Sequence, residues 1–477
     1  MKPSALLFLA GSAAAVKTGR TFAVMRFNGD AIFNGRIDPI VSPGGVSSHV
    51  HTVMGSSGFG PSATGESIVA ANCTNAKLKG DHSNYWYPRL YFRDPKNGTL
   101  EAVPMFYTNA YYFFEATDDD IKAFPVGLSM ISGNISLRTP PASGSQILDP
   151  AMGTIQPVGI TCPRQSYTPP SWPLGSDGTH IGMQDPKNAN QGVGFPNQEC
   201  DGYASPLRTD IHFPSCYNPA AGLTDYKNNM AWPSSENSAT GRANCPEGWI
   251  HTPHLFIEVY WNTPLFLSRW TPGGATQPFV LSNGDATAYS LHADFMSGWD
   301  QDLLQHIIDT CNAGDDGMDK CPGVQDQVSE EKCSVPPFFE EDIDGPFQTL
   351  PGGLPITGWE FGDGEAEQVS SSSVSFYPSS AGTSFPSSVA SSVSASASPT
   401  YKETNVDAIE AFETTSSVTS ATTATSSTAA ASSTKSVCES KKVHTVWQTV
   451  TVSGDVTVST ETVSATPYMR RRRHHRR

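Results

Sequence analysis

The chain has 477 residues, and its 30 Lys and Arg against 46 Asp and Glu give a formal net charge of −16 at pH 7. An acidic chain lacks the positive field that attracts nucleic acids and anionic membranes, so neither is an expected partner. Charged residues make up only 16%, and the 41 Gly and 37 Pro favour turns and loops, which excludes coiled coils and multi-span membrane proteins.

The first 18 residues predict a signal peptide. Lys2 supplies a positive charge, residues 5–10 form an apolar run, and small residues follow at 12–15, as a signal peptidase site requires. The apolar run is too short to span a bilayer, which takes about 20 residues. No other stretch is long and apolar enough. We therefore expect a secreted protein with no membrane span.

Residues 19–365 are expected to form one globular domain. Aromatic-rich segments predict strands at 85–92, 105–107, 110–114 and 255–261. A helix is predicted over 298–311, where Asp300 and Asp302 suit the first turn and apolar residues recur at helical spacing, namely Leu303, Leu304, Ile307 and Ile308. Many strands and few helices favour a mainly β fold, a large β-sandwich or jelly roll with long loops and a few short helices.

Nine cysteines fit an oxidising compartment. Eight lie in the predicted domain and allow up to four disulfides, whose pairing the sequence does not give. Cys311 and Cys321 are close enough to close a local loop. No CxxC pair occurs, which argues against a zinc ribbon or a thioredoxin motif. The ninth, Cys438, lies beyond the domain and is either free or intermolecular.

The composition changes after residue 365. Residues 366–436 are dominated by Ser, Thr and Ala, cannot bury enough apolar surface to fold, and predict a disordered, O-glycosylated stalk. Residues 437–477 hold a β-prone segment and an end rich in Arg and His. Three sequons, at Asn72, Asn97 and Asn134, predict N-glycosylation of surface loops. We expect the stalk to space or tether the domain.

Three pairs of polar residues two positions apart are the candidate functional residues: His49 with His51, Asp210 with His212, and His292 with Asp294. On a strand, side chains two apart point to the same face. Each pair therefore places two ligand-capable groups on one side of a sheet. Together they offer four imidazoles and two carboxylates for one cleft.

Several kinds of chemistry remain open for these residues. His49, His51, His212 and His292 suit Zn or Cu, with an open position for water if the site is catalytic. Without a metal, Asp210 or Asp294 would orient a histidine for acid/base work. Carboxylates for a glycosidase pair, Glu258 among them, are also present. Alternatively, the histidines only hydrogen-bond buried backbone groups. No Gly-x-Ser-x-Gly elbow, P-loop or dinucleotide fingerprint appears.

Six motifs stand in order along the domain: Phe27-Asn-Gly-Asp30, Arg36-Ile-Asp-Pro39, Ser48-His-Val-His51, Tyr85-Trp-Tyr-Pro-Arg-Leu-Tyr91, Asp210-Ile-His-Phe-Pro-Ser-Cys216 and His292-Ala-Asp-Phe-Met-Ser-Gly-Trp-Asp300. They resemble the motifs of a secreted fungal family catalogued as a domain of unknown function (number 1996), over residues 21–322. The resemblance implies an extracellular location and a shared fold, and it supplies no settled activity.

The chain departs from that family's pattern in two places. Tyr226 and Asn229 stand in a segment where the family commonly has histidines. His251 and His254 follow the Cys245-Pro motif at a shifted spacing. A family site that used those histidines would be altered in this chain.

We therefore expect a secreted protein that acts on or at extracellular polysaccharide, such as that of a cell wall. Its cleft would be lined by the three pairs, His49, His51, Asp210, His212, His292 and Asp294. As an enzyme it would be a hydrolase or a lyase, and in a lyase a histidine or Tyr226 would remove a proton beside a carboxylate. The alternative is a non-catalytic wall-associated binding or structural protein, whose histidines hold a metal or satisfy the core.

Overall fold

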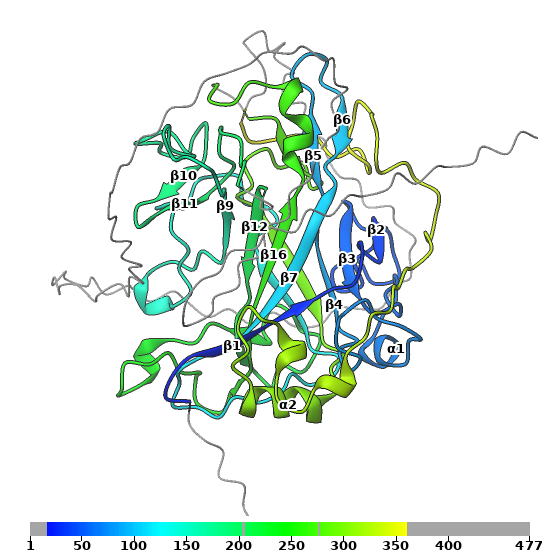
Figure 1. Ribbon diagram of the computed structural model, residues 1–477, viewed down its shortest axis with the longest axis vertical. Coiled ribbons are helices and arrows are strands. Elements are labelled where there is room, and N and C mark those ends of the chain that lie inside the picture. Colours follow the sequence, from blue (N-terminus) through cyan, green and yellow to red (C-terminus); the bar gives the residue numbers. More distant parts are fainter. Residues whose placement is uncertain (1–16, 203–205, 275–276, 360–477) are drawn as a thin grey trace, which may run out of the picture. The chain divides into compact units, whose positions relative to one another are not determined.

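The computed structural model describes residues 17–202, 206–274 and 277–359 (Figure 1). These residues all belong to one compact unit. The predicted signal peptide lies almost wholly outside the described ranges. The predicted stalk, the β-prone segment, Cys438 and the Arg/His-rich end lie wholly outside them.

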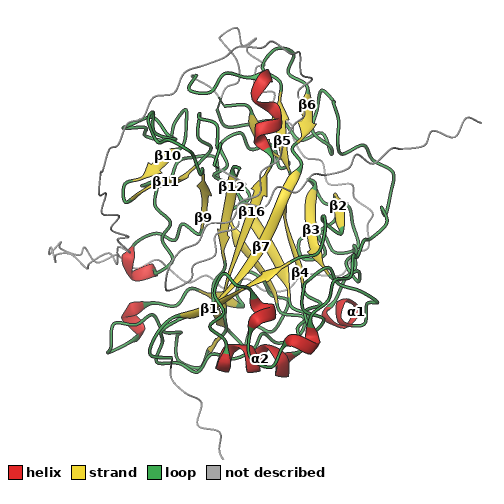
Figure 2. Cartoon of the chain, in the orientation of Figure 1, coloured by secondary structure: helices red, strands yellow, loops and turns green. Residues whose placement is uncertain are grey.

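Two large antiparallel sheets dominate the described residues (Figures 1 and 2). The seven-stranded sheet has the order β1 (Thr21–Arg26), β7 (Met105–Phe114), β16 (His254–Trp261), β12 (Arg208–His212), β9 (Val158–Thr161), β11 (Asn188–Val193) and β10 (Met183–Asp185). The five-stranded sheet has the order β2 (Phe33–Gly35), β3 (His51–Gly55), β4 (Asn84–Pro88), β18 (His292–Met296) and β8 (Ser129–Gly133).

Smaller elements surround these sheets. Two three-stranded sheets have the orders β14 (Met230–Ala231), β13 (Cys216–Tyr217), β15 (Ile250–His251) and β17 (Phe279–Leu281), β5 (Leu90–Arg93), β6 (Leu100–Ala102). The α-helices are α1 (Gly65–Val69) and α2 (Gln301–Thr310). Short 3-10 helices cover Pro150–Met152, Ser235–Asn237, Thr263–Arg269, Met318–Lys320 and Gln325–Gln327. No helix in the described ranges is long and apolar enough to cross a membrane.

The two large sheets pack face to face, and their inner side chains form the main core. Strand alternation turns Tyr85 of β4 and Tyr112 of β7 inward, where their hydroxyl groups hydrogen-bond. Trp299 donates to Tyr112 over 2.9 Å, and Tyr85 donates to Asp81 over 2.7 Å. A buried polar chain thus links the sheets through the core, and each donor in it has its acceptor. The predicted mainly β sandwich with few short helices is confirmed.

The local predictions are confirmed with shifted boundaries. The predicted helix begins at residue 301, because the Asp300 side chain caps the backbone N–H groups of residues 302 and 303. Segments 105–107 and 110–114 are one strand, β7. The predicted strand 85–92 is instead two strands in different sheets, β4 and β5. Pro88 ends β4, because it has no backbone N–H to continue the ladder.

Four disulfides cross-link the domain: Cys73–Cys333, Cys162–Cys200, Cys216–Cys245 and Cys311–Cys321. The last is the local loop that the sequence predicts. The first fixes residues 329–341, which we call the cover segment, against the outer face of the five-stranded sheet. There the backbone N–H of Val335 donates to the carbonyl of Ile32 over 2.8 Å, and Phe339 packs on the cluster around Trp86.

Candidate functional site

Three histidines meet on the outer face of the five-stranded sheet. His51 is the first residue of β3 and His292 the first residue of β18, two strands that flank β4. Pro88 of β4 lies opposite His51 in the ladder, so a short side chain separates the two imidazoles. His49 approaches from the loop before β3. Their exposed fractions are 2% or less.

The imidazole nitrogens converge on one point. One ring nitrogen from each histidine lies within 4.8 Å of the other two. The Nε2 atoms of His49 and His292 are 3.1 Å apart. A tetrahedral Zn²⁺ with Zn–N bonds of about 2.0–2.1 Å separates its nitrogens by about 3.3 Å. The His49–His292 spacing is therefore close to that of two ligands on one ion.

Backbone carbonyls fix the tautomers of two of these histidines. Nδ1 of His51 donates to the carbonyl of Ile37 over 3.0 Å, and Nδ1 of His292 donates to the carbonyl of Ser290 over 2.8 Å. Each Nε2 therefore carries the lone pair that a metal would use. Nε2 of His51 is buried and has no hydrogen-bond partner.

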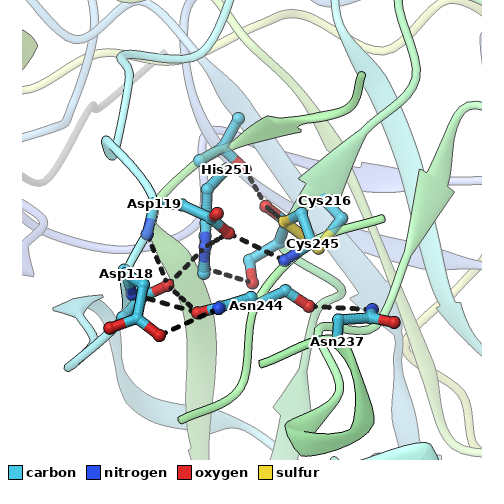
Figure 3. The surroundings of a disulfide bond; sticks show 10 residues. Asp118, Asp119, Cys216, Asn237, Asn244, Cys245 and His251 are labelled. Atoms are coloured by element: carbon cyan, nitrogen blue, oxygen red, sulfur yellow. Dashed lines mark hydrogen bonds and ion pairs between the residues drawn. A yellow bond between two sulfur atoms is a disulfide. The ribbon is translucent and has the colours of Figure 1, made fainter. Parts of the chain in front are cut away.

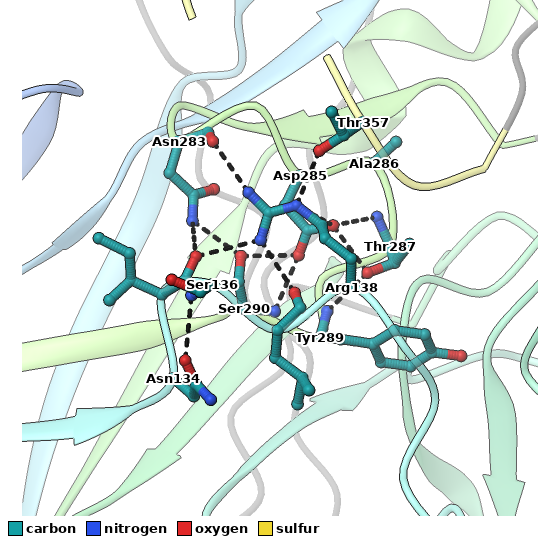
Figure 4. Close-up of polar contacts among 12 residues, drawn as sticks. Asn134, Ser136, Arg138, Asn283, Asp285, Ala286, Thr287, Tyr289, Ser290 and Thr357 are labelled. Atoms are coloured by element: carbon teal, nitrogen blue, oxygen red, sulfur yellow. Dashed lines mark hydrogen bonds and ion pairs between the residues drawn. The ribbon is translucent and has the colours of Figure 1, made fainter. Parts of the chain in front are cut away.

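The carbonyl that holds His292 is itself rigidly placed (Figure 4). Buried Asp285 accepts hydrogen bonds from the backbone N–H of Ser290 over 2.8 Å and from its hydroxyl over 2.7 Å. Asn283 also donates to that hydroxyl over 2.7 Å, and Arg138 lies 3.7 Å from Asp285. The orientation of His292 thus depends on a second layer of polar contacts.

Burial keeps the three imidazoles neutral. It lowers the pKa of His51 and of His292 to about 4, with the neighbouring His51 adding to the effect at His292. The pKa of His49 is also lowered well below its usual range, first by burial and then by His51, His292 and Arg138. Neutral imidazole is the form that ligates a metal.

Two buried carboxyl groups lie near the cluster. Asp294 follows His292 by two residues and shares its face of β18, and burial together with Asp38 raises the pKa of Asp294 well above its usual range. One oxygen of Asp294 has no hydrogen-bond partner. Burial also raises the pKa of Asp38, although its side chain accepts the backbone N–H groups of Ile40 and Val41 and lies close to His292.

Asp210 and His212 lie apart from this cluster, on the outer face of the seven-stranded sheet. Cross-strand pairing places Asp210 opposite Glu258 and His212 opposite Phe256. The predicted pairs therefore occupy two sites rather than one cleft, because β12 belongs to the other sheet of the sandwich. His212 contacts His254 rather than the other predicted ligands, His49, His51 and His292. Nδ1 of His212 lies 3.0 Å from Nε2 of His254.

An ion network occupies the middle of this second face. Arg208 donates to Asp210 over 2.6 Å and also to Glu258. Burial raises the pKa of both carboxyl groups, and Arg208 opposes that effect. Burial works against the charge of Arg208, but the two carboxylates hold its pKa above its usual range. Thr161 donates its hydroxyl to Asp210.

A third group, Asp119, Cys245 and His251, has ligand-like spacing but is structural (Figure 3). Cys245 is bonded to Cys216, so its sulfur is not a thiolate that could bind a metal. The His251 ring pairs with Asp119 over 3.0 Å, and the same carboxylate accepts the backbone N–H of Cys245. These contacts fix the loop around the disulfide.

Sequence reasoning missed Glu115, and it did not place Asp38 or His254 among the candidate site residues. Glu115 accepts a hydrogen bond from Nδ1 of His254 over 3.0 Å, which adds a carboxylate and a second imidazole to His212. The sequence signal was present for His254, which stands near His251 beside a Cys-Pro motif, but its partner is 139 residues away. Only the pairing of β7 with β16 brings the two together.

Fold and sites define a disulfide-linked β-sandwich with a buried histidine cluster on one outer face and an acid/base network on the other. The family described as Domain of unknown function (DUF1996) matches residues 38–299, more than half of the chain, so the chain belongs to this family. No curated protein and no solved structure matches it. The matched range holds His49, His51, Asp210, His212, His292 and Asp294.

Proposed function

We propose that the domain is an extracellular metalloprotein in which His49, His51 and His292 hold one Zn or Cu ion. The observation that carries the proposal is the convergence of three neutral, buried imidazole nitrogens within 4.8 Å, two of them from rings locked by backbone carbonyls. The predicted signal peptide and the four disulfides support an extracellular location.

A metal accounts for this cluster better than hydrogen bonding alone. Among the three Nε2 atoms, a single N–H···N bond between His49 and His292 leaves the Nε2 of His51 buried and unpaired. An unsatisfied buried acceptor costs about 1–3 kcal/mol. One ion would use all three lone pairs. It would leave a fourth position for a water molecule, on which Zn or Cu would act as a Lewis acid.

Metal content tests this directly. The full chain should carry about one Zn or Cu per molecule by elemental analysis. His51→Ala should lose it, whereas His180→Ala, which replaces an exposed histidine, should keep it. If His51→Ala does not fold, chelation of the wild-type chain in mild denaturant, where the site opens, and retitration with Zn²⁺ and Cu²⁺ under the same conditions gives the stoichiometry instead. A wild-type chain that binds neither ion would overturn the proposal.

As a second function, we propose that the protein acts on or at extracellular polysaccharide, as a hydrolase or a lyase. The observation that favours this function is the combination of aromatic, imidazole and carboxyl groups on the outer face of the seven-stranded sheet. New reducing ends would identify a hydrolase, and ultraviolet absorbance from an unsaturated sugar would identify a lyase. A chain that binds a polymer without either product is the non-catalytic wall-associated alternative. A chain that neither binds nor cleaves any polysaccharide contradicts both.

A further inference from the structure

The outer face of the seven-stranded sheet carries a continuous strip of aromatic side chains. Aromatic residues on β1, β7, β16 and β12 that lie opposite one another in the strand pairing all point to this face. The rings contact one another from strand to strand, and the strip consists of Phe22, Tyr111, Phe113, Phe256 and His212. A second pair, Tyr107 and Tyr260, stacks at 4.2 Å farther along the same face.

Part of this strip is accessible. Phe22, Tyr111 and His212 are each partly exposed, although the neighbouring rings of β16 are buried. The His212 ring lies flat on Phe256, with ring centres 4.1 Å apart and planes within 9°. Flat, rigid rings of this kind offer contact area at little cost in conformational entropy.

The hydrogen-bond chain behind His212 fixes its tautomer. Glu115 has a lowered pKa, in which burial is outweighed by its contacts with His254 and Arg20, so its carboxylate only accepts. With His254 neutral, its Nδ1 carries the proton, its Nε2 accepts, and Nδ1 of His212 donates to that Nε2. The lone pair of His212 consequently lies on Nε2, which has no hydrogen-bond partner among the described residues.

Glu258 lies close by on the same face, but it is not open to a ligand. Its carboxyl group is buried and accepts from Arg208, and burial raises its pKa while contacts with Tyr111 and Asn109 lower it. Glu258 pairs across the strands with Asp210, two residues before His212 on β12. The open acceptor of this face is therefore Nε2 of His212, and a ligand must bring a hydrogen-bond donor to it.

Among the described residues, the guanidinium groups of this face already have partners. Arg208 lies between Asp210 and Glu258, and Arg20 lies 3.6 Å from Glu115 while covering the ring of Phe113 at 3.8 Å. Arg26 of β1 donates to the backbone carbonyls of Asp315 and Asp316. An anionic polymer would find no unpaired guanidinium among these groups, and the carboxylates that a cationic polymer needs are engaged. Charge complementarity thus favours a neutral ligand.

We propose that the outer face of the seven-stranded sheet binds a neutral polysaccharide, whose sugar rings stack on Tyr111 and Phe22 and whose hydroxyl groups donate to His212. This inference rests on the proposed action at polysaccharide and names its binding face and substrate class. Glu115 and His254 act as positioning residues, because they keep Nε2 of His212 free to accept. The face lies on the opposite side of the sandwich from the three-histidine cluster, so polymer binding is independent of the metal.

Titration calorimetry of the full chain with three soluble polymers tests the inference: a neutral β-glucan, polygalacturonate and chitosan oligosaccharides. We expect binding of the glucan alone. Tyr111→Ala and His212→Ala should weaken it at least tenfold, and His254→Phe several-fold. Phe338→Ala removes an exposed ring beyond the strip and should bind as the wild type does. Each variant should keep its metal content and its melting temperature within a few degrees.

A readout on the wild-type chain covers the case in which a variant does not fold. Bound glucan should slow amide hydrogen exchange in β7 and β16. Glucan binding that leaves these strands unprotected, or that Tyr111→Ala and His212→Ala do not weaken, would overturn the binding face while leaving action on polysaccharide intact. Tighter binding of a charged polymer would overturn the substrate class. Failure of all three polymers to bind would overturn this inference, and the polysaccharide function falls with it only if no polysaccharide is cleaved to reducing ends or unsaturated sugars.

Discussion

The Cys73–Cys333 bridge should be far more stabilising than the local bridge between Cys311 and Cys321. The first pair is 260 residues apart and the second 10. A cross-link removes entropy from the unfolded chain with the logarithm of the loop length, about 5.6 kcal/mol for the long loop and about 2.7 kcal/mol for the short one at 25 °C. Cys73→Ala/Cys333→Ala should therefore lower the free energy of unfolding by about 3 kcal/mol more than Cys311→Ala/Cys321→Ala.

Urea unfolding of the two double variants, followed by tryptophan fluorescence, measures this difference. Cys311 and Cys321 are 1% and 2% exposed, whereas Cys333 is 8% exposed and Cys73 more than that. Loss of packing therefore destabilises the short-loop variant more, and this effect reduces the predicted difference in free energy of unfolding between the two variants. Equal losses, or a larger loss in the short-loop variant, would show that packing rather than chain entropy sets the contribution of these bridges.

Three other predictions concern the histidine cluster and the core. Gly133→Ala should weaken metal binding at least tenfold, because the added Cβ would lie 2.2 Å from the carbonyl oxygen of Leu291 and 2.8 Å from Cα of His292. Gly175→Ala is the control: this glycine also has a positive φ but has open space around it, so metal binding should not change. Chelation in mild denaturant, followed by return to buffer, should lower the melting temperature by about 4 °C, if free metal at 100 times its Kd adds about 2.7 kcal/mol to a domain of about 340 residues. Burial raises the pKa of Asp81 from 3.8 to about 6. Its stabilising contribution is therefore complete below pH 3.8 and is lost as the pH rises through 6, which lowers the free energy of unfolding by about 3 kcal/mol. Urea titrations should find this loss in the wild type and not in Asp81→Asn.

Local patterns were enough to predict the fold class and the neighbours within each site. The alternation of aromatic residues in 105–114 and 255–261 predicts strands, and the side chains two apart do share a face, as His292 and Asp294 show. The capping Asp300 and the apolar spacing that follows predict α2. Each of these signals lies within about ten residues, which is the range over which propensity and periodicity operate.

The sequence does not reveal which sheet each strand joins. His51 and His292 are 241 positions apart in the printed sequence and meet only because β3 and β18 both pair with β4. Asp210 and His212 carry the same two-residue spacing, yet β12 pairs with β9 and β16 in the other sheet. Strand order depends on long-range packing, so no local pattern separates the pair that joins the histidine cluster from the pair that does not.

The enclosure of the histidine cluster has a consequence for when it is loaded. Its ligands come from two distant parts of the chain, and the cover segment is held over the same face by a covalent bond between Cys73 and Cys333. An ion bound there would leave only through local unfolding, which is slow once the bridge has formed. The metal content of the mature protein would therefore record the ions present where the chain folded, rather than those it meets afterwards.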